Sequence, residues 1–214
     1  KIPVTVVYSD DKGENWTTCE LDKIYTADYY YVKFFDSDNG VIVCGYAKSN
    51  DTNESSRIYS TNNGGESWDI VGSGPATNII KGVVYVSSDV GFFCYDYVEG
   101  MDSNLYKTDD GGKTFAKVML EEQELDSSAA NPQGQETETK TDSGKNGADS
   151  SEQLRWGDVS KEALTPVVDS TGIITIYLTQ GKNAVYNDGK TAAKYQSSDK
   201  GSTWKYIGQV EIKD

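Results

Sequence analysis

The sequence predicts an all-β protein built from four-stranded antiparallel sheets, and three observations support this fold class. An octet of the form Ser/Thr-x-Asp/Asn-x-Gly-x-x-Trp/Phe occurs four times, at residues 9–16, 61–68, 108–115 and 197–204. A second pattern, in which a polar turn separates two apolar runs, occurs three times. The 21 Gly and 15 Tyr among 214 residues suit a protein rich in strands and turns. Such repeats indicate that one structural unit recurs along the chain.

The octet has the composition of a tight turn between two antiparallel strands. Its Asp or Asn side chain is expected to accept hydrogen bonds from backbone N–H groups two residues further on. Its Gly can adopt positive φ, and its Ser or Thr hydroxyl can bond locally. The aromatic residue starts the outgoing strand and brings apolar area to the core. The predicted turn residues are Ser9, Asp11, Gly13, Trp16, Thr61, Asn63, Gly65, Trp68, Thr108, Asp110, Gly112, Phe115, Ser197, Asp199, Gly201 and Trp204.

The octet resembles the Asp box of the bacterial-neuraminidase-type repeats. These repeats occur in sialidases, in sortilin-like receptors, in photosystem-assembly factors of the Ycf48 type and in many uncharacterised bacterial proteins. In that family the box joins the third and fourth strands of a β-propeller blade, so the resemblance implies a β-propeller here. It implies no activity, because function depends on a site that the fold carries.

The second pattern is typical of a hairpin made from the first two strands of a blade. It occurs at residues 32–43, 83–93 and 166–176. Together the two patterns predict half a blade followed by three full ones, or about 3.5–4 blades. Since a propeller needs a closed ring to hide its edges, three explanations stay open. The missing strands lie upstream of Lys1, the chain is a piece of a larger ring, or the ring closes in an unusual way.

We treat residues 1–214 as a single propeller domain or propeller fragment with one insert. The octet aromatics are separated by 52, 47 and 89 residues, so the last interval holds extra sequence. We assign it to an acidic, low-complexity insert at about 121–163 rather than to a degenerate blade. This segment carries eleven acidic and four basic residues. Its composition predicts a solvated loop, with a binding flap as the alternative.

Charge and composition exclude several classes of function. A formal net charge of −14 opposes binding to nucleic acid and to anionic lipid. No apolar stretch is long enough to insert into a membrane, and no signal peptide is seen. Because the chain opens within the repeat, we expect a processed or trimmed N-terminus and an extracytoplasmic protein, secreted or anchored at the cell surface.

The sequence predicts no cofactor and no metal. It has no His, and Cys19, Cys44 and Cys94 lack metal-ligand spacing. We expect these cysteines to be inert core thiols, with a disulfide as the less favoured alternative. Asp96, Glu99 and Asp102 could hold Ca²⁺ through their oxygens, but a solvated acidic loop is the preferred interpretation.

The long, irregular loops are predicted to lie at the end of the blades opposite the octets, where binding sites usually form. Aromatic residues in and near these loops suit stacking on a sugar or anchoring of a peptide. The alternative is that they pack between blades. The candidate binding residues are Tyr29, Tyr46, Tyr95, Tyr97, Trp156 and Tyr186.

We predict a non-catalytic, extracytoplasmic binding module for a protein or a glycan. Sialidases of the family that the octets resemble bind the substrate carboxylate with three arginines. This chain has only Arg57 and Arg155, so we do not expect sialidase activity. The alternative function is a glycoside hydrolase with paired carboxylates, although no acidic residue stands in a catalytic motif. An assembly factor of the Ycf48 type is not favoured, because the arginine-rich patch of those factors is lacking.

Overall fold

The computed structural model describes residues 3–24, 27–46, 56–76, 78–121, 162–180 and 189–212, which contain strands and no α-helix. The strands are β1 (Thr5–Tyr8), β2 (Thr17–Glu20), β3 (Tyr29–Phe34), β4 (Gly40–Gly45), β5 (Ser56–Thr61), β6 (Asp69–Ser73), β7 (Ile80–Tyr85), β8 (Gly91–Tyr95), β9 (Leu105–Thr108), β10 (Ala116–Lys117), β11 (Glu162–Ala163), β12 (Val167–Val168), β13 (Ile174–Thr179), β14 (Thr191–Ser197) and β15 (Lys205–Glu211). Within these ranges, no helix has the length and apolar character needed to cross a membrane.

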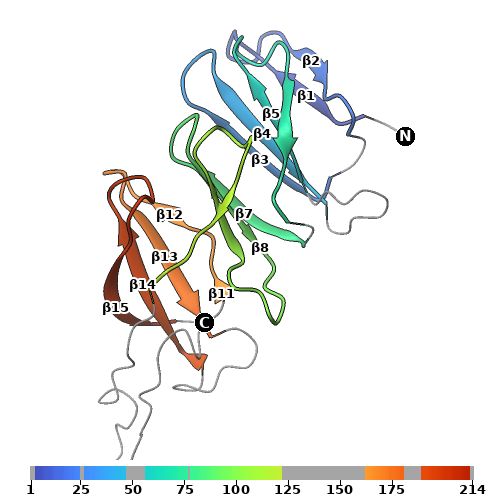
Figure 1. Cartoon of the computed structure of the whole chain (residues 1–214). Helices are drawn as coiled ribbons and strands as arrows, with labels where there is room; N and C mark the ends of the chain where they lie inside the picture. Colours follow the sequence, from blue (N-terminus) through green and yellow to red (C-terminus); the bar gives the residue numbers. More distant parts are fainter. Residues whose placement is uncertain are drawn as a thin grey trace, which may run out of the picture.

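The strands form four antiparallel sheets that follow one another in chain order (Figure 1). The first sheet contains β1 and β2, the second runs β3-β4-β5-β6, and the third runs β7-β8-β9-β10. In the fourth sheet, β11 and β12 both pair with β13, which is followed by β14 and β15. The first strand of this sheet is split next to Pro166, which has no N–H to donate. The two-stranded sheet and the three larger ones correspond to the predicted half blade followed by three full blades.

Each sheet packs face to face on the next one through an apolar cluster. The cluster between the first and second sheets contains Leu21, Ile24, Ile42, Cys44, Tyr59 and Trp68. The cluster between the second and third contains Val41, Val43, Ile58, Ile80, Val83, Tyr85, Phe93 and Tyr95. The cluster between the third and fourth contains Val90, Phe92, Cys94, Leu105, Val118, Ala163, Ile174 and Ile176. Antiparallel sheets stacked in chain order are the blades of a β-propeller, which confirms the predicted fold class.

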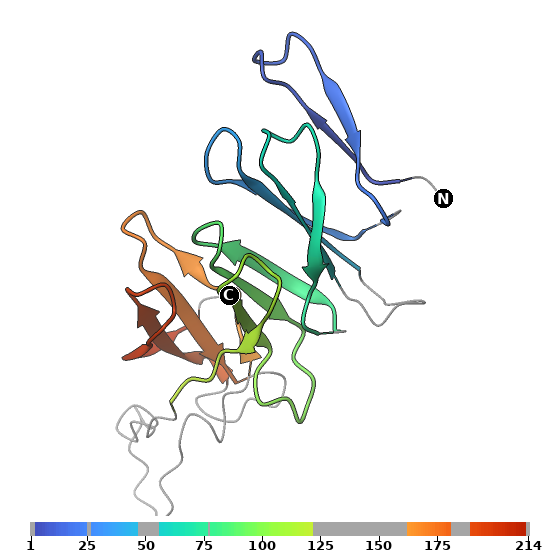
Figure 2. The ribbon, with the colours of Figure 1, turned by 45° about the horizontal axis from the view of Figure 1, so that its top comes forward.

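The described blades do not close a ring among themselves. In Figures 1 and 2 the first and last sheets lie at opposite ends of the row of blades. The second strand of each inner blade is therefore enclosed on both faces, and every residue of β4 and β8 is buried. Such strands appear in the sequence as unbroken apolar runs.

The first strands of the second and third blades are joined by side chains. The Tyr29 and Tyr31 hydroxyls on β3 accept hydrogen bonds from the backbone N–H groups of Val83 and Tyr85 on β7, at 2.9 and 3.0 Å. The Lys33 Nζ donates to the Tyr85 carbonyl oxygen. Because β7 is the edge strand of its sheet, these groups have no strand partner on that side. Three alternate residues of β3 thus satisfy the inner edge of the next blade.

All four octets are hairpin corners, as predicted, and they share one hydrogen-bond pattern. In the third octet, Thr108 Oγ1 donates to Asp110 Oδ1 and accepts from the Gly112 N–H, both at 2.8 Å. The Asp110 carboxylate then accepts from the backbone N–H and the hydroxyl of Thr114, at 2.8 and 2.6 Å. The glycines at the fifth position of the octets, Gly13, Gly65, Gly112 and Gly201, have φ between +76° and +106°. The prediction of bonds two residues after the Asp or Asn was wrong, since the backbone N–H donors lie four residues after it and, in the third and fourth octets, also three residues after it.

These bonds stabilise the charged form of the octet carboxylates. Hydrogen bonds from Asn15 and Ser9 lower the pKa of Asp11 to about 2. Bonds from the side chain and backbone of Thr114 and of Thr203 hold the pKa values of Asp110 and Asp199 well below their ordinary value. The second octet carries Asn63 instead, whose amide oxygen accepts equivalent bonds from Thr61 and Ser67.

The three cysteines are free, so the disulfide alternative is wrong. Cys44 in β4 and Cys94 in β8 are both buried, Cys44 between the first and second blades and Cys94 between the third and fourth. Removal from water raises the pKa of both thiols to about 12. Residues 122–161 lie outside the described part of the chain, so nearly all of the acidic insert stays a prediction.

Candidate binding surface

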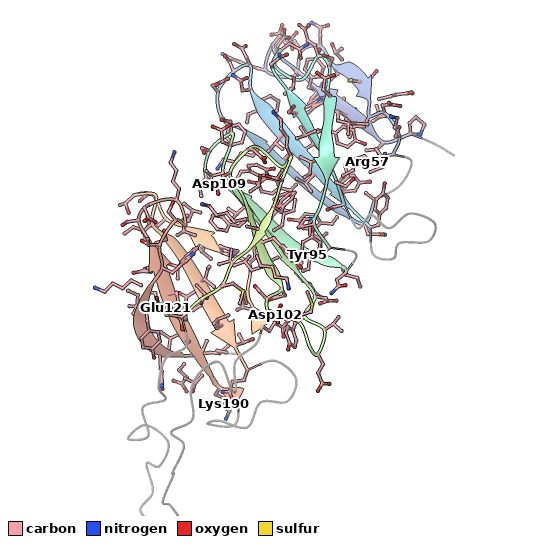
Figure 3. All side chains as sticks on the ribbon, in the orientation of Figure 1. Arg57, Tyr95, Asp102, Asp109, Glu121 and Lys190 are labelled. Atoms are coloured by element: carbon pink, nitrogen blue, oxygen red, sulfur yellow. The ribbon has the colours of Figure 1, made fainter. Side chains whose placement is uncertain are left out.

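The antiparallel topology places the octets and the turns between the first and second strands at one end of the blades, and the remaining connections at the opposite end, which we call the loop end. Asp109 follows β9 at the octet end, whereas Tyr95 and Asp102 lie at the loop end of the same blade (Figure 3). The described residues of the loop end include 21–24, 27–28, 74–76, 78–79 and 96–104. The candidate surface is built from residues 96–104 and from the β6–β7 connection beside them, of which residues 74–76 and 78–79 are described.

The β8–β9 loop, Asp96–Asn104, projects from the loop end and is ordered by its own bonds (Figures 1 and 2). Its base is closed by the bond from the Tyr95 N–H to the Asn104 carbonyl, at 2.9 Å. A turn near its tip is closed by the bond from the Met101 N–H to the Val98 carbonyl, at 3.0 Å. Gly100 has a φ of +92° in this turn, a value that favours glycine.

The loop is also tied to the β6–β7 connection. The Asp96 N–H donates to the Ile79 carbonyl at 2.8 Å, and the Asn78 side-chain amide donates to the Asp96 carbonyl at 3.2 Å. The ion pair between Lys81 and Asp96, at 2.7 Å, crosses the same junction. The result is a preorganised projection with Ile79 and Val98 exposed to solvent beside the exposed Glu99.

The acidic residues of this loop do not converge on a metal site. Asp96 pairs with Lys81, and Asp102 pairs with Lys117 at 2.8 Å, a bond that lowers the pKa of the Asp102 carboxyl. No group of three or more acidic or sulfur ligands is close enough to hold a metal within the described ranges. The Ca²⁺ alternative for Asp96, Glu99 and Asp102 therefore has no supporting geometry.

Among the described candidates, Tyr29 and Tyr95 belong to the cluster between the second and third blades, whereas Tyr46 packs against the cluster between the first and second. Tyr95 is completely buried between the second and third blades, so it cannot offer its ring to a partner. Tyr29 is half-buried and bonded to β7. Tyr46 and Tyr97 are half-buried at the loop end. Trp156 and Tyr186 lie outside the described residues. For Tyr29 and Tyr95 the packing alternative is the one the structure supports.

The described carboxyl groups give little basis for acid catalysis. Every described carboxyl with a shifted pKa has that pKa lowered, whereas a general acid needs a raised one.

Arg57 donates from Nη1 to the Lys23 carbonyl at 2.7 Å and so holds the connection between the first two blades.

Sequence reasoning missed several residues that shape the loop end. The Tyr two positions before the octet is one example: the Tyr59 hydroxyl donates to the Asp22 carbonyl at 2.7 Å, and the Tyr195 hydroxyl donates to the Glu121 carbonyl at 2.9 Å. Each bond holds the connection that leaves the preceding blade. The signal was present, because Tyr occupies this position before three of the four octets. Ile79 and Val98 carry no comparable signal.

Asn104 was also missed, and it fixes the start of the fourth blade. Its buried amide donates to the Ala163 carbonyl at 2.9 Å and accepts from the Ala163 N–H at 2.8 Å. A further bond joins its Nδ2 to the Tyr95 carbonyl at 2.8 Å. The side chain thus pairs with β11 much as a neighbouring strand would.

No protein-family model matches the chain, and no curated protein matches it. Among solved structures, the chain is similar to the Niastella koreensis GH74 enzyme, with a TM-score of 0.49 and 16% identity over 95% of this chain and 26% of that chain. It is also similar to YCF48 bound to D1 peptide, with a TM-score of 0.36 and 15% identity over 96% of this chain and 76% of that chain. The chain thus spans about a quarter of the length of the GH74 enzyme. Both likenesses are too distant to transfer a site or an activity.

Proposed function

We propose that this chain is a non-catalytic binding module that recognises a protein through the loop end of its blades. The observation that carries the proposal is the β8–β9 loop, which is braced at its base and at Asp96 and which exposes Val98 and Glu99. A rigid projection loses little conformational entropy on binding, so more of its contact energy appears as affinity.

The chemistry of the loop favours a protein with a basic rim around an apolar centre. Ile79 and Val98 offer apolar area, and Glu99 offers a negative charge beside it. Opposite charges on the partner would steer the encounter and fix its orientation. A glycan is less favoured, because Tyr95 is buried and Tyr29 is bonded within the fold.

The proposal includes the type of repeat and the location of the protein. We infer that the four octets are Asp boxes, because all four share the bond pattern between Ser/Thr, Asp/Asn and the residue four positions later. We also propose that the module lies outside the cytoplasm, secreted or at the cell surface, on its resemblance to repeat proteins of that kind.

Affinity capture with paired variants tests the proposal. The tagged 214-residue chain is used as bait for proteins of the source organism, alongside Val98→Glu/Glu99→Lys and the control Glu14→Lys. Glu14 is an exposed acid at the octet end, and its replacement changes the charge on the opposite surface by +2, against a net +1 for the loop variant. We expect a protein that binds the wild type and the control, is lost with the loop variant, and binds less tightly as salt is raised.

Two results would contradict the proposal. One is capture that the loop variant and the control lose equally. The other is saturable binding to a carbohydrate array that survives the loop change, which would point to a glycan.

A further inference from the structure

The tip of the β8–β9 loop is closed by a methionine sulfur that accepts two hydrogen bonds. The Met101 Sδ accepts from the backbone N–H of Val98 and from the side-chain amide of Asn78, both at 3.3 Å. The Met101 N–H donates in turn to the Val98 carbonyl at 3.0 Å. Met101 therefore closes the turn twice, through its backbone and through its sulfur, and the sulfur ties the turn to the β6–β7 connection.

The bond from Asn78 to the sulfur joins the tip of the loop to the rest of the blade. The Asn78 amide has two hydrogens, and it donates to the Asp96 carbonyl at the start of the loop as well as to Met101. Asp96 is held a second time by Lys81. Within the described part of the chain, no other hydrogen bond or ion pair joins residues 97–101 to another strand or connection. This bond is therefore the polar contact that fixes the tip.

Oxidation of the sulfur is incompatible with both of its hydrogen bonds. A thioether sulfur has two lone pairs and is a weak acceptor, and here the two N–H donors use both lone pairs. The oxygen of a sulfoxide is attached through one of these lone pairs. Since each donor nitrogen lies only 3.3 Å from the sulfur, an oxygen atom has no room between them. The Met101 side chain must therefore turn away from Val98, from Asn78 or from both.

The chain contains a reference for this reaction. Its two methionines are Met101 and Met119. Met101 is half-buried near the tip of a projecting loop, so a small oxidant can reach its sulfur. Met119 is 63% exposed and follows β10, outside the β8–β9 loop. Oxidation of Met119 is thus the same chemistry without the change at the loop.

We propose that Met101 is an oxidation site and that its sulfoxide releases the tip of the β8–β9 loop. The co-reactant is a peroxide. A released tip no longer presents Val98 and Glu99 in one arrangement, so a protein bound there loses affinity, because ordering the tip again costs conformational entropy. This effect on binding rests on the proposed function, whereas the release of the tip does not.

The reaction transfers one oxygen atom to the sulfur. A lone pair of the Met101 Sδ forms the S–O bond as the O–O bond of hydrogen peroxide breaks, and the second peroxide oxygen leaves as water with both hydrogens. The sulfur is oxidised by two electrons, and the peroxide is reduced by two. Methionine sulfoxide reductases reverse the change, so the closed turn can be restored.

Two variants with one methionine each separate the loop from the reference site. Met119→Leu retains the sulfur of Met101, and Met101→Leu retains that of Met119. Each 214-residue chain is treated with hydrogen peroxide, peptide mass spectrometry measures the sulfoxide, and amide hydrogen exchange follows residues 97–101. We expect the Val98 amide of Met119→Leu to exchange about three- to tenfold faster after oxidation, as the loss of one hydrogen bond implies.

Further measurements use the same two chains. A protease specific for Glu should cut the oxidised Met119→Leu chain after Glu99 faster than the untreated chain. A methionine sulfoxide reductase should return both rates to their starting values. Met101→Leu lacks the sulfur acceptor, so its loop should exchange fast before treatment and stay unchanged after it. For a protein captured at the loop end, oxidation should weaken binding by about three- to tenfold to Met119→Leu alone.

Four outcomes would overturn the inference. The first three are a Met101 that stays reduced in the folded chain while Met119 is oxidised, equal exchange at residues 97–101 before and after oxidation of Met101, and the same increase in oxidised Met101→Leu. The fourth is a captured protein that binds oxidised and untreated Met119→Leu equally. Failure to capture any protein would contradict the proposed function instead, and hydrogen exchange on the chain alone would still decide whether the tip is released.

Discussion

The Tyr29 hydroxyl lies 2.9 Å from the backbone nitrogen of Val83 on the next blade and accepts its hydrogen bond. Tyr31 repeats the contact at Tyr85, so β7 is held along its inner edge by the side chains of β3. The second and third blades share no strand pairing. They are joined by these hydrogen bonds between backbone N–H groups and side-chain hydroxyls as well as by apolar packing.

Replacing Tyr29 with Phe tests this contact. The variant leaves the Val83 N–H without its acceptor, so we expect the free energy of unfolding to fall by about 1–2 kcal/mol. The control is Tyr30→Phe, which removes an exposed hydroxyl from the other face of the same strand and should change stability by less than about 0.5 kcal/mol. Urea denaturation measures both. Equal effects would show that the hydroxyl bond is unimportant.

The octet carboxylates make stability depend on pH in the acid range. Their pKa is lowered on folding, so the stability they contribute is present at neutral pH and is lost as protons bind. For Asp11, with a folded pKa of about 2 against an ordinary value of 3.8, the loss falls between about pH 4 and pH 2. Asp110→Asn should retain the turn, as Asn63 does in the second octet, and should flatten the acid dependence.

Thermal unfolding at several pH values between neutral and about pH 2 measures this effect. Asp10→Asn is the control, because Asp10 is an exposed acid of the first octet that lies outside the shared bond pattern. A pH profile of Asp110→Asn identical to that of the wild type would contradict the prediction.

Cysteine labelling tests the burial of the second strands. Burial raises the pKa of the Cys44 and Cys94 thiols to about 12, and Cys19 is partly exposed. Since the thiolate is the reactive form, we expect iodoacetamide to add one label to the native protein near pH 8 and three in urea. Mass spectrometry counts the labels, and two or three labels on the native chain would contradict the packing of β4 and β8.

The glycine of the fourth octet is required for two reasons that a pair of variants can separate. Gly201 has a φ of +76°, and a Cβ there would lie 2.5 Å from the Phe92 ring. Gly172 has a φ of +85° with open space around its Cβ position. Gly172→Ala should cost about 1–2 kcal/mol for the backbone alone, and Gly201→Ala about 1–3 kcal/mol more for the clash. Equal costs in urea denaturation would contradict the contact with Phe92.

The hairpin corners were predictable because their chemistry is local. The Ser or Thr, the Asp or Asn and the Gly of each octet bond to one another within a few residues, so their spacing alone identifies the turn. The seventh position escaped notice because Asn15, Ser67, Thr114 and Thr203 share a polar character rather than one residue type.

The binding surface was harder to predict because burial depends on neighbours distant in sequence. Tyr95 looks like a loop aromatic, yet it ends a strand that both adjacent blades enclose. The run from Gly91 to Tyr95 shows no alternation, so the sequence cannot tell which side chains face water. Val98 is exposed because the β8–β9 loop projects from the blade, and an isolated apolar residue gives no sign of that.

Two side chains, Tyr195 and Asn104, fix the ends of the segment between Glu121 and Glu162 through three hydrogen bonds. The Tyr195 hydroxyl holds the Glu121 carbonyl, and the Asn104 amide holds both backbone groups of Ala163. Because these anchors belong to the blades, the blades themselves determine where the chain leaves the third blade and enters the fourth. We expect that an epitope tag or a fluorescent reporter inserted between Glu121 and Glu162 leaves these two anchors in place.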